Sequence, residues 1–173
     1  MSRTLTVALV LSAALTGCGS DTQSVGTAPT PTATTFSSSA CTPSETGMKD
    51  LTKKPVVTVP KTPAPTETTI VDIVCGTGAV AGPGSRVEVK YVGVLYDGGT
   101  EFDSSWSRGA DNTLPFSIGG GVIPGFSKGA EGMRIGGRRE VTIPSKDGYG
   151  DQANGPIPAA ATLIFVIDLV TVS

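Results

Sequence analysis

Alternating apolar and polar positions indicate strands over most of the second half of the chain. In residues 86–91, valine or tyrosine alternates with a charged residue at every step, which is the pattern of a strand with one buried face. Residues 162–172 have apolar side chains at alternate positions and predict a final strand. Shorter β-rich runs predict further strands at residues 70–74, 101–104, 114–118 and 138–143.

One segment has the spacing of a helix instead. Within residues 123–133, Phe126, Ala130 and Met133 are three and four positions apart, so a short helix would present them on one face. Residues 144–161 contain Pro and Gly clusters and predict a long loop. Strands therefore outnumber helices, and the predicted fold class is α+β, a mainly antiparallel sheet that carries one short α-helix.

The chain begins with the features of an export signal. Residues 5–15 form an apolar run after a single positive residue, Arg3, and the run is too short to span a membrane. It ends in Leu-Thr-Gly-Cys at residues 15–18, which resembles the lipobox of bacterial lipoproteins. The resemblance implies a signal peptide at residues 1–17 and a diacylglyceryl group on Cys18, which anchors the chain in the cell membrane on its extracytoplasmic side. The alternative is an ordinary secretory signal in which Cys18 occurs by chance.

A polar stretch separates this signal from the folded domain. Ser, Thr and Pro make up most of residues 20–46, and there is little to bury, so residues 18–54 are expected to form a disordered tether. The domain is expected at residues 55–173, with its core at 70–173. Residues 55–65 are still Pro-rich but contain valines, and we expect them to lie extended along the domain.

Composition excludes several classes of function. The formal net charge is -2, which gives no basic footprint for nucleic acid. The chain has no histidine, so it cannot hold a Ser-His-Asp triad, a Cys-His pair or a His-bearing metal site. Three distant cysteines cannot supply the four ligands of a zinc site, and no metal or cofactor is expected. Any chemistry must use carboxylates, hydroxyls, backbone groups or shape.

The two remaining cysteines are candidates for a disulfide. Once Cys18 is lipidated, Cys41 and Cys75 are the only pair left, and an exported chain meets an oxidising compartment. A bond between them would close a loop of about 35 residues and stabilise the fold by about 3–4 kcal/mol on the chain-entropy argument. Two independent thiols are the alternative, because Cys41 lies in the Ser/Thr/Pro-rich stretch.

Some polar and glycine-rich segments could indicate a catalytic or ligand-binding site, but a purely structural role explains them as well. Glu101 and Asp103 are two apart on a predicted strand, which would suit a paired-carboxylate hydrolase but also a solvated edge. Three consecutive glycines at 119–121 lack the Lys-Ser/Thr ending of a phosphate-binding loop and predict a turn. The arginines of the region that follows are expected to be solvated; they are Arg134, Arg138 and Arg139.

The aromatic residues are more informative, since they recur about once per predicted element. They include Tyr91, Phe102, Phe116, Phe126, Tyr149 and Phe165. A core is the default interpretation of such residues. A pocket is favoured as well, because Tyr149 lies between two glycines of a loop and because the turn at 122–125 leaves a backbone N–H free at the start of the helix.

The order of the motifs resembles that of FKBP-type peptidyl-prolyl isomerases over about residues 70–172. The matching motifs lie at residues 91–93, 99–105, 115–116, 122–126, 129–130, 133–137, 143–144, 149–150 and 157–158. The resemblance implies a strongly twisted antiparallel sheet wrapped around one short helix. It also implies peptidyl-prolyl cis-trans isomerase activity (EC 5.2.1.8) and a pocket between sheet and helix that accepts the proline ring of a substrate.

The resemblance assigns a role to individual residues of this pocket. The implied catalytic positions are Tyr91, Phe102, Asp103, Ile123, Tyr149 and Phe165. The implied substrate-binding positions are Phe116, Val122, Phe126, Ile157 and Arg108. Among them Phe126 would form the floor, Phe116 would lie at the rim and Ile157 would cap the opening. Arg108 would pair with Asp103, while the Tyr149 hydroxyl and the Ile123 N–H would donate to substrate carbonyls.

The implied partners are Pro-containing polypeptide clients, in particular exported proteins that fold outside the membrane, and macrolides of the rapamycin type. Two positions differ from the best-known family members, which have Trp at the floor position, here Phe126, and often a second Phe at Ile118. A non-catalytic Pro-peptide-binding module or chaperone on the same fold is the alternative function. A solute-binding lipoprotein is disfavoured because the folded part is too small for two lobes.

Overall fold

The computed structural model describes residues 41–43 and 48–173. The predicted signal peptide, the predicted lipidation site Cys18 and the first part of the predicted tether lie outside the described residues. No helix in the described part of the chain has the length and hydropathy needed to cross a membrane.

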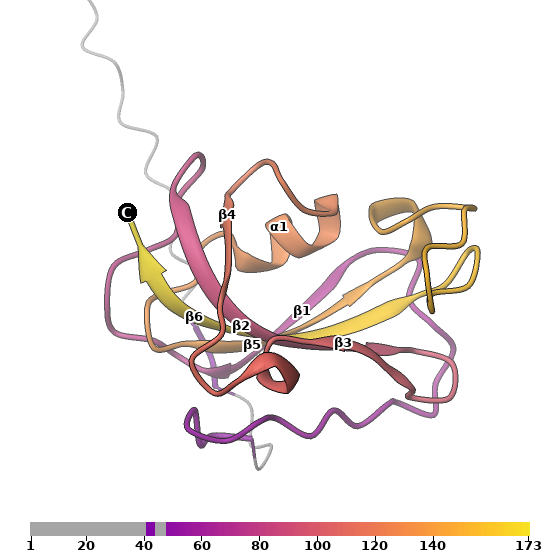
Figure 1. Cartoon of the computed structure of the whole chain (residues 1–173), viewed down its shortest axis with the longest axis horizontal. Coiled ribbons are helices and arrows are strands. Elements are labelled where there is room, and N and C mark those ends of the chain that lie inside the picture. Colours follow the sequence, from indigo (N-terminus) through magenta and orange to yellow (C-terminus); the bar gives the residue numbers. More distant parts are fainter. Residues whose placement is uncertain (1–40, 44–47) are drawn as a thin grey trace, which may run out of the picture. The chain divides into compact units, whose positions relative to one another are not determined.

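The described chain forms one antiparallel sheet with one α-helix on its inner face (Figure 1). The elements in order are β1 (Thr69–Val74), β2 (Arg86–Leu95), β3 (Glu101–Ser104), η1 (Trp106–Arg108), β4 (Leu114–Ser117), α1 (Pro124–Ala130), β5 (Arg138–Ile143), η2 (Ser145–Asp147) and β6 (Leu163–Val172). The strand order is β1-β5-β6-β2-β3, and β4 pairs with β2 beside this path. The predicted α+β class is therefore confirmed.

The long strand β2 organises the sheet, because it pairs with β3, β4 and β6. Its register shifts between Glu88 and Val89 and again between Gly93 and Val94. Such irregularities bend a strand and increase its twist, which lets the sheet curve around α1. Figure 1 shows β2 and β6 curving beneath the helix.

The helix is shorter than the spacing predicted, since it ends at Ala130 and Glu131 has an extended backbone. Met133 is still buried, but it reaches the core through the turn that follows the helix. Two glycines allow α1 to lie close to β5. A Cβ atom at Gly125 would lie 2.3 Å from Ile143, and one at Gly129 would lie 2.5 Å from Val141.

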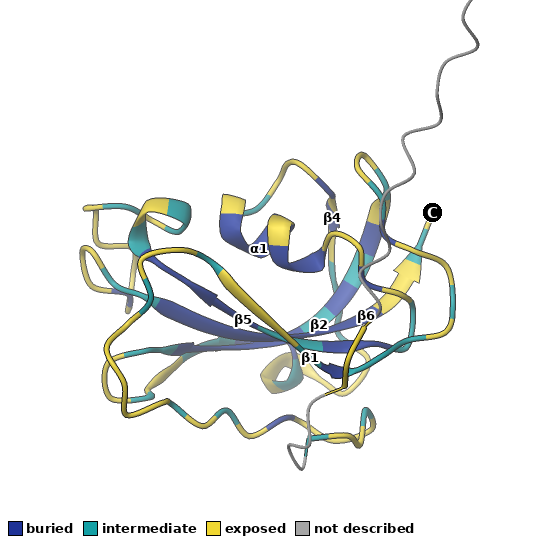
Figure 2. Ribbon diagram, turned by 180° about the vertical axis from the view of Figure 1, so that it is seen from behind, coloured by how far each residue is buried: buried dark blue, intermediate teal, exposed yellow. Residues whose placement is uncertain are grey.

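The inner face of the sheet and α1 enclose the main core. Its fully buried members come from β2, β5 and β6, and they alternate along each strand as a half-buried pattern requires; they include Val87, Val89, Val141, Ile143, Leu163 and Ile167. Figure 2 shows this buried layer running through the centre of the sheet. Burial of this layer is the main source of stability for the fold.

The outer face of the sheet is covered by the segment that precedes β1, which we call the arm (residues 48–68). Val57 and Val59 pack against a second cluster formed by Val92, Val94 and Ile164. The hydroxyl of Tyr96 donates to the carbonyl oxygen of Thr62 at 3.1 Å, which fixes a later part of the arm. In Figure 1 the arm runs on the side of the sheet opposite to α1. The prediction that residues 55–65 lie extended along the domain is confirmed.

One arginine predicted to be solvated is instead the most deeply buried charge of the described chain. The Arg138 side chain is 1 % exposed, and it donates to both carboxylate oxygens of Asp168 at 2.5 and 2.7 Å. It also donates to the carbonyl oxygens of Met48, Asp50 and Lys53. A buried charge is tolerated only when such partners replace its hydration. Residues 48–53, which the composition placed in the tether, are thus bound to the sheet.

The neighbouring arginine was also predicted wrongly, whereas Arg134 is exposed as expected. Arg139 is largely buried on the inner side and pairs with Asp72 at 2.6 Å. It donates to the carbonyl oxygens of Gly129 and Glu131 as well, so it fills the space at the end of α1. Arg138 and Arg139 are consecutive on β5 and therefore lie on opposite faces of the sheet, but the sequence of the strand carries no information about what covers each face.

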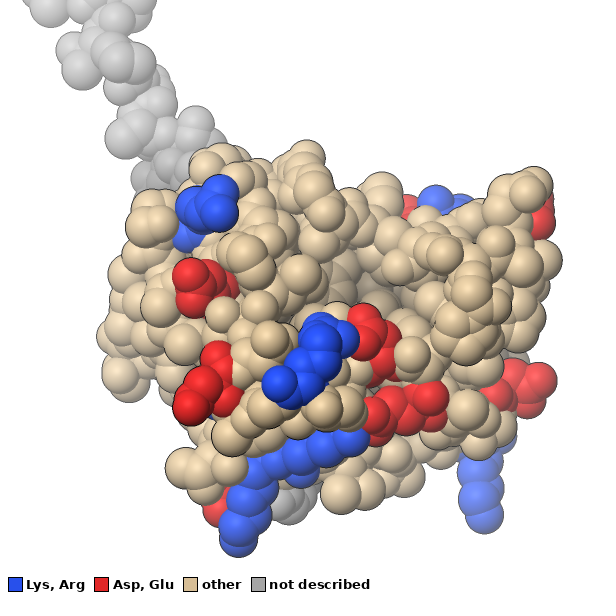
Figure 3. All heavy atoms as spheres, viewed as in Figure 1, with Lys and Arg blue, Asp and Glu red and all other residues tan. Residues whose placement is uncertain are grey.

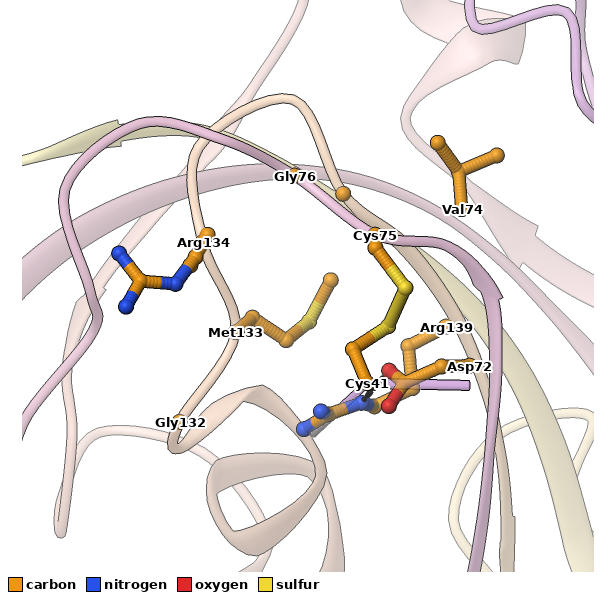
Figure 4. Close-up of a pocket in the computed structure, with 10 residues that line it drawn as sticks. Cys41, Asp72, Val74, Cys75, Gly76, Gly132, Met133, Arg134 and Arg139 are labelled. Carbon is orange, nitrogen blue, oxygen red and sulfur yellow. Dashed lines mark hydrogen bonds and ion pairs between the residues drawn. A yellow bond between two sulfur atoms is a disulfide. The ribbon is translucent and has the colours of Figure 1, made fainter. Parts of the chain in front are cut away.

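The structure joins Cys41 to Cys75 by a disulfide, with 34 residues of sequence separation. Figure 4 shows the bond beside the Arg139–Asp72 pair, with the Met133 side chain pointing towards it and the Arg134 side chain pointing away. The adjoining cavity measures about 60 Å³. The disulfide attaches residue 41 to the end of β1, and Arg138 holds the chain again a few residues later.

Candidate active site

A pocket of about 170 Å³ opens between α1, the inner face of the sheet and the loop after β5. Its lining residues are Tyr91, Phe102, Asp103, Leu114, Gly121, Val122, Ile123, Phe126, Tyr149 and Phe165. Figure 3 shows this face of the molecule, where uncharged side chains border most of the hollow and charged ones gather along one side.

Edge-to-face ring contacts build the pocket. Phe126, from α1, is 3 % exposed and lies at the centre, with its ring centroid 5.0 Å from that of Phe165 and 5.7 Å from that of Tyr91. Phe165 in turn contacts Phe102 at 5.5 Å. Interplanar angles of 84° to 85° are the preferred geometry for such rings, because the positive edge of one meets the negative face of the next. Each ring therefore limits the rotation of its neighbour.

Gly93 makes room for this arrangement. It lies on β2 between the Phe102 and Phe165 rings, and a Cβ atom there would approach both to within 2.9 Å. Since real Cβ atoms do not come so close to ring carbons, any other residue at this position would separate the two rings. Gly93 thus allows the Phe102 and Phe165 rings to contact each other.

A closed triangle of hydrogen bonds lies at the edge of the pocket. The Tyr91 hydroxyl donates to Asp103, and Arg108 donates to Asp103 at 2.6 Å and to the Tyr91 hydroxyl at 2.8 Å. The Asp103 and Arg108 side chains are 44 % and 45 % exposed, so water reaches them from outside. Arg108 does not line the pocket itself, but it holds two residues that do.

The triangle moves its members' pKa values away from the neutral range. Burial raises the pKa of Asp103, but the hydrogen bonds from Tyr91 and Arg108 outweigh it and leave the pKa below its usual value. Burial, together with the hydrogen bond to Asp103, raises the pKa of Tyr91. Asp103 therefore stays ionised and Tyr91 stays protonated around neutral pH, and neither is suited to exchange a proton with a substrate.

The backbone of Tyr91 is held from the other side. The Ser105 hydroxyl, which is fully buried, accepts a hydrogen bond from the Tyr91 N–H at 2.9 Å, and the Ser105 N–H donates to the Tyr91 carbonyl oxygen at 3.1 Å. Ser105 was not among the predicted site residues. It ends the family-like motif at residues 99–105, directly after the strand that carries Phe102 and Asp103.

Glu101 does not belong to this cluster. Lys54 donates to its carboxylate at 2.8 Å, whereas Asp103 is paired with Arg108. Each carboxylate thus has its own cation, and the four side chains are between 37 % and 45 % exposed. The solvated-edge interpretation fits these contacts, and the paired-carboxylate interpretation has no support in them.

Two hydrogen-bond donors at the pocket are left without acceptors. Ile123 lies just before α1 with an extended backbone, and no described residue accepts a hydrogen bond from its N–H. Tyr149 is 37 % exposed, and no described residue is hydrogen-bonded to its hydroxyl. Both residues line the pocket, so these donors are available to a ligand.

Two of the expected binding residues lie elsewhere. Phe116 is not at the rim: it is 5 % exposed and packs behind the floor, with its ring 5.6 Å from that of Phe126. Ile157 does not cap the opening, because reciprocal backbone hydrogen bonds with Asn154 close a tight turn and its side chain is buried in the core. Leu114 and Gly121 line the pocket but were not selected. Leu114 begins a predicted strand, and Gly121 lies in the predicted glycine turn.

Comparisons with known proteins agree with this geometry. The family model for FKBP-type peptidyl-prolyl cis-trans isomerases matches residues 78–170. A probable FK506-binding protein of Corynebacterium glutamicum is 45% identical over 119 residues, which cover 69% of this chain and 98% of that protein. An FK506-binding protein of Streptomyces anulatus is 47% identical over 123 residues, with the same coverage of both chains. The crystal structure of AtFKBP13 has a TM-score of 0.57 at 35% identity and covers 64% of this chain and 96% of its own.

Proposed function

The chain belongs to the FKBP-type peptidyl-prolyl cis-trans isomerase family, and on that premise we propose that its aromatic pocket isomerises X-Pro bonds of exported polypeptides. The observation that carries the proposal is the pocket itself. Aromatic rings enclose a space with Phe126 at its floor, and two unused donors lie at its wall. The proline ring of the client enters this space, and the amide bond before it lies near the donors.

The reaction needs no proton transfer to a catalytic residue, which suits a chain without histidine. The barrier to rotation about the bond is about 18–20 kcal/mol and reflects the loss of amide resonance. The planar amide is more dipolar than the twisted one, so an apolar environment disfavours the ground state relative to the transition state. The Ile123 N–H and the Tyr149 hydroxyl then stabilise the carbonyl groups of the twisted substrate.

Asp103, Tyr91 and Arg108 have a supporting role in this mechanism. Their hydrogen bonds fix the Tyr91 ring, which contacts Phe126 and Phe165. Asp103 has a lowered pKa and three donors around it, so it acts as a fixed charge and not as a base. The triangle holds the Tyr91 side of the pocket wall in place while the X-Pro bond rotates.

Several features support a role outside the cytoplasm. The lipobox-like residues 15–18 suggest export and lipidation at Cys18, which lies outside the described residues. The Cys41–Cys75 disulfide suits an oxidising compartment. Uncatalysed X-Pro exchange takes tens to hundreds of seconds, so an isomerase there accelerates the folding of exported clients. Replacement of Cys18 by Ala tests the anchor: the variant should remain unprocessed or leave the membrane, and normal processing and membrane association would reject the assignment.

The names of the relatives also suggest a ligand. Two of them are called FK506-binding proteins, and we propose that macrolides of this type compete with Pro-containing peptides for the pocket. Phe126 occupies the floor position at which the family commonly has Trp. Phe126→Trp should therefore keep isomerase activity and tighten macrolide binding, which a competition assay measures.

The experiment that tests the proposed function is a cis/trans exchange measurement by NMR, with the chain from residue 18 onwards and a short Pro peptide. Catalysed exchange that a macrolide inhibits is the expected result. Peptide binding without faster exchange would instead identify a non-catalytic Pro-peptide-binding module.

A further inference from the structure

The loop that carries Tyr149 contacts the arm. The arm precedes residues 78–170, which the family model matches. Tyr149 lies two residues after η2, between Gly148 and Gly150. No described residue is hydrogen-bonded to its hydroxyl, so no such bond holds the donor directly, and its position depends on the backbone and the packing around the side chain. Contacts that fix η2 therefore help to fix the position of the donor.

Hydrogen bonds within the loop form one half of this attachment. The N–H groups of Gly148 and Gly150 both donate to the carbonyl oxygen of Ser145, at 2.9 and 2.8 Å, which closes a tight turn around Tyr149. The Ala160 N–H donates to the Gly150 carbonyl oxygen at 3.0 Å and ties the turn to the far end of the same loop. These bonds define the shape of the turn, but they do not fix the turn relative to the sheet.

The arm supplies the other half. The Thr68 hydroxyl donates to the Asp147 carboxylate at 2.6 Å, and both residues are half-buried. Lys146 pairs with Glu67 next to it, but these side chains are 53 % and 72 % exposed, and exposed pairs of this kind contribute little. In Figure 1 the segment leading into β1 passes beside the loop after β5. The Thr68–Asp147 hydrogen bond is thus the stronger of the two contacts.

We propose that Thr68 is a positioning residue for the isomerase, acting through Asp147 to hold Tyr149 at the pocket. This inference rests on the proposed role of the Tyr149 hydroxyl. Thr68 itself precedes residues 78–170, which the family model matches. It also gives the arm a second task besides covering the outer face.

The test is a double-mutant cycle on the chain from residue 18 onwards. Thr68→Val keeps the shape of the side chain and removes the donor, and we expect kcat/KM to fall about two- to fivefold, mainly through kcat. In a Tyr149→Phe background the same change should have no further effect, because the donor that Thr68 positions is already absent. Thr68→Ser should restore activity. Thr66→Val is the matched control, since Thr66 is exposed two residues earlier and has no hydrogen bond within the described chain.

A spectroscopic measurement separates positioning from a general loss of stability. The chain has three tyrosines, so 3-fluorotyrosine labelling gives three fluorine signals, which Tyr→Phe variants assign. Thr68→Val should shift or broaden the Tyr149 signal and leave those of Tyr91 and Tyr96 in place. An unchanged Tyr149 signal, or equal effects of Thr68→Val in both backgrounds, would overturn the proposal. Full activity of Tyr149→Phe would be a different failure, because it would reject the role of Tyr149 itself.

Discussion

The two faces of the sheet bury their residues by different means. The inner face is covered by α1 and filled mainly with apolar and aromatic side chains; the Arg139–Asp72 pair lies at the end of α1, and exposed charges lie at the edge of the pocket. The outer face has a small apolar cluster of Val92, Val94 and Ile164, and beside it the buried Arg138–Asp168 pair that binds the arm. The inner face thus holds the proposed chemistry, while the outer face fixes a flanking segment. Apart from the Thr68–Asp147 contact of the arm, changes to the outer face should affect stability without activity, and changes to the pocket should do the reverse.

Removal of Arg138 should have the largest effect on stability. Arg138→Met leaves Asp168 buried without its partner and frees three arm carbonyl groups, so the free energy of unfolding should fall by about 3–5 kcal/mol. Denaturant titration measures this loss, and exchange kinetics at a temperature where the variant is folded should show unchanged kcat/KM. Arg134→Met is the control, because Arg134 is exposed and its loss should cost under about 0.5 kcal/mol. A large drop in kcat/KM for folded Arg138→Met would show that the two faces are not independent.

Loss of the disulfide should have the next largest effect. With 34 residues between the cysteines, replacing both Cys41 and Cys75 by Ser should lower the unfolding free energy by about 3–4 kcal/mol on the chain-entropy argument. Activity at low temperature should be retained, because neither residue lines the pocket. Equal stability of the variant and the parent would show that the contacts of Arg138 alone hold this segment.

Opening the wall of the pocket should have the opposite effect, a large loss of activity with a smaller loss of stability. Phe102→Ala removes the ring that contacts Phe165 and lets water into the pocket, so kcat/KM should fall by more than about tenfold. Phe102 is only partly buried, and the stability loss should stay below that of Arg138→Met. Thermal unfolding and exchange kinetics on the same sample give both numbers. A variant with normal activity and a greatly lowered Tm would contradict the division between the faces.

The smallest expected effect is that of pH on catalysis. Asp103 has a lowered pKa, so its ionised contacts, which stabilise the fold, are complete above the pKa of an unfolded Asp and are lost only as pH falls towards the folded value. Tyr91 has a raised pKa and stays protonated as pH rises through the ordinary tyrosine value. The kcat/KM profile should therefore be flat between about pH 5 and 9, where neither group titrates. A bell-shaped profile centred near neutral pH would point to acid–base catalysis.

Sequence alone predicted the inner face better than the outer one. Alternation along β2 and β6 and one aromatic ring per element are local signals, and they identified Tyr91, Phe126 and Phe165 as residues that the structure brings together. The three arm carbonyl groups that bind Arg138 lie 85 to 90 positions earlier in the chain, so nothing near it indicated that the polar face would be covered. The predicted position of Ile157 at the pocket opening was wrong for a similar reason. Two backbone hydrogen bonds with Asn154 form a turn inside a Pro- and Gly-rich loop, and this turn directs the Ile157 side chain into the core.

The central claim is that an apolar pocket with two placed donors isomerises the X-Pro bond without proton transfer. Its most direct test is kcat/KM for Tyr149→Phe and Phe102→Ala, measured on folded protein with the same short Pro peptide. Tyr149→Phe removes one hydrogen bond and should cost a few-fold, at most about tenfold, whereas Phe102→Ala should cost more because it hydrates the pocket. Abolished activity in Tyr149→Phe together with retained activity in Phe102→Ala would contradict the claim and would require a mechanism in which Tyr149 transfers a proton.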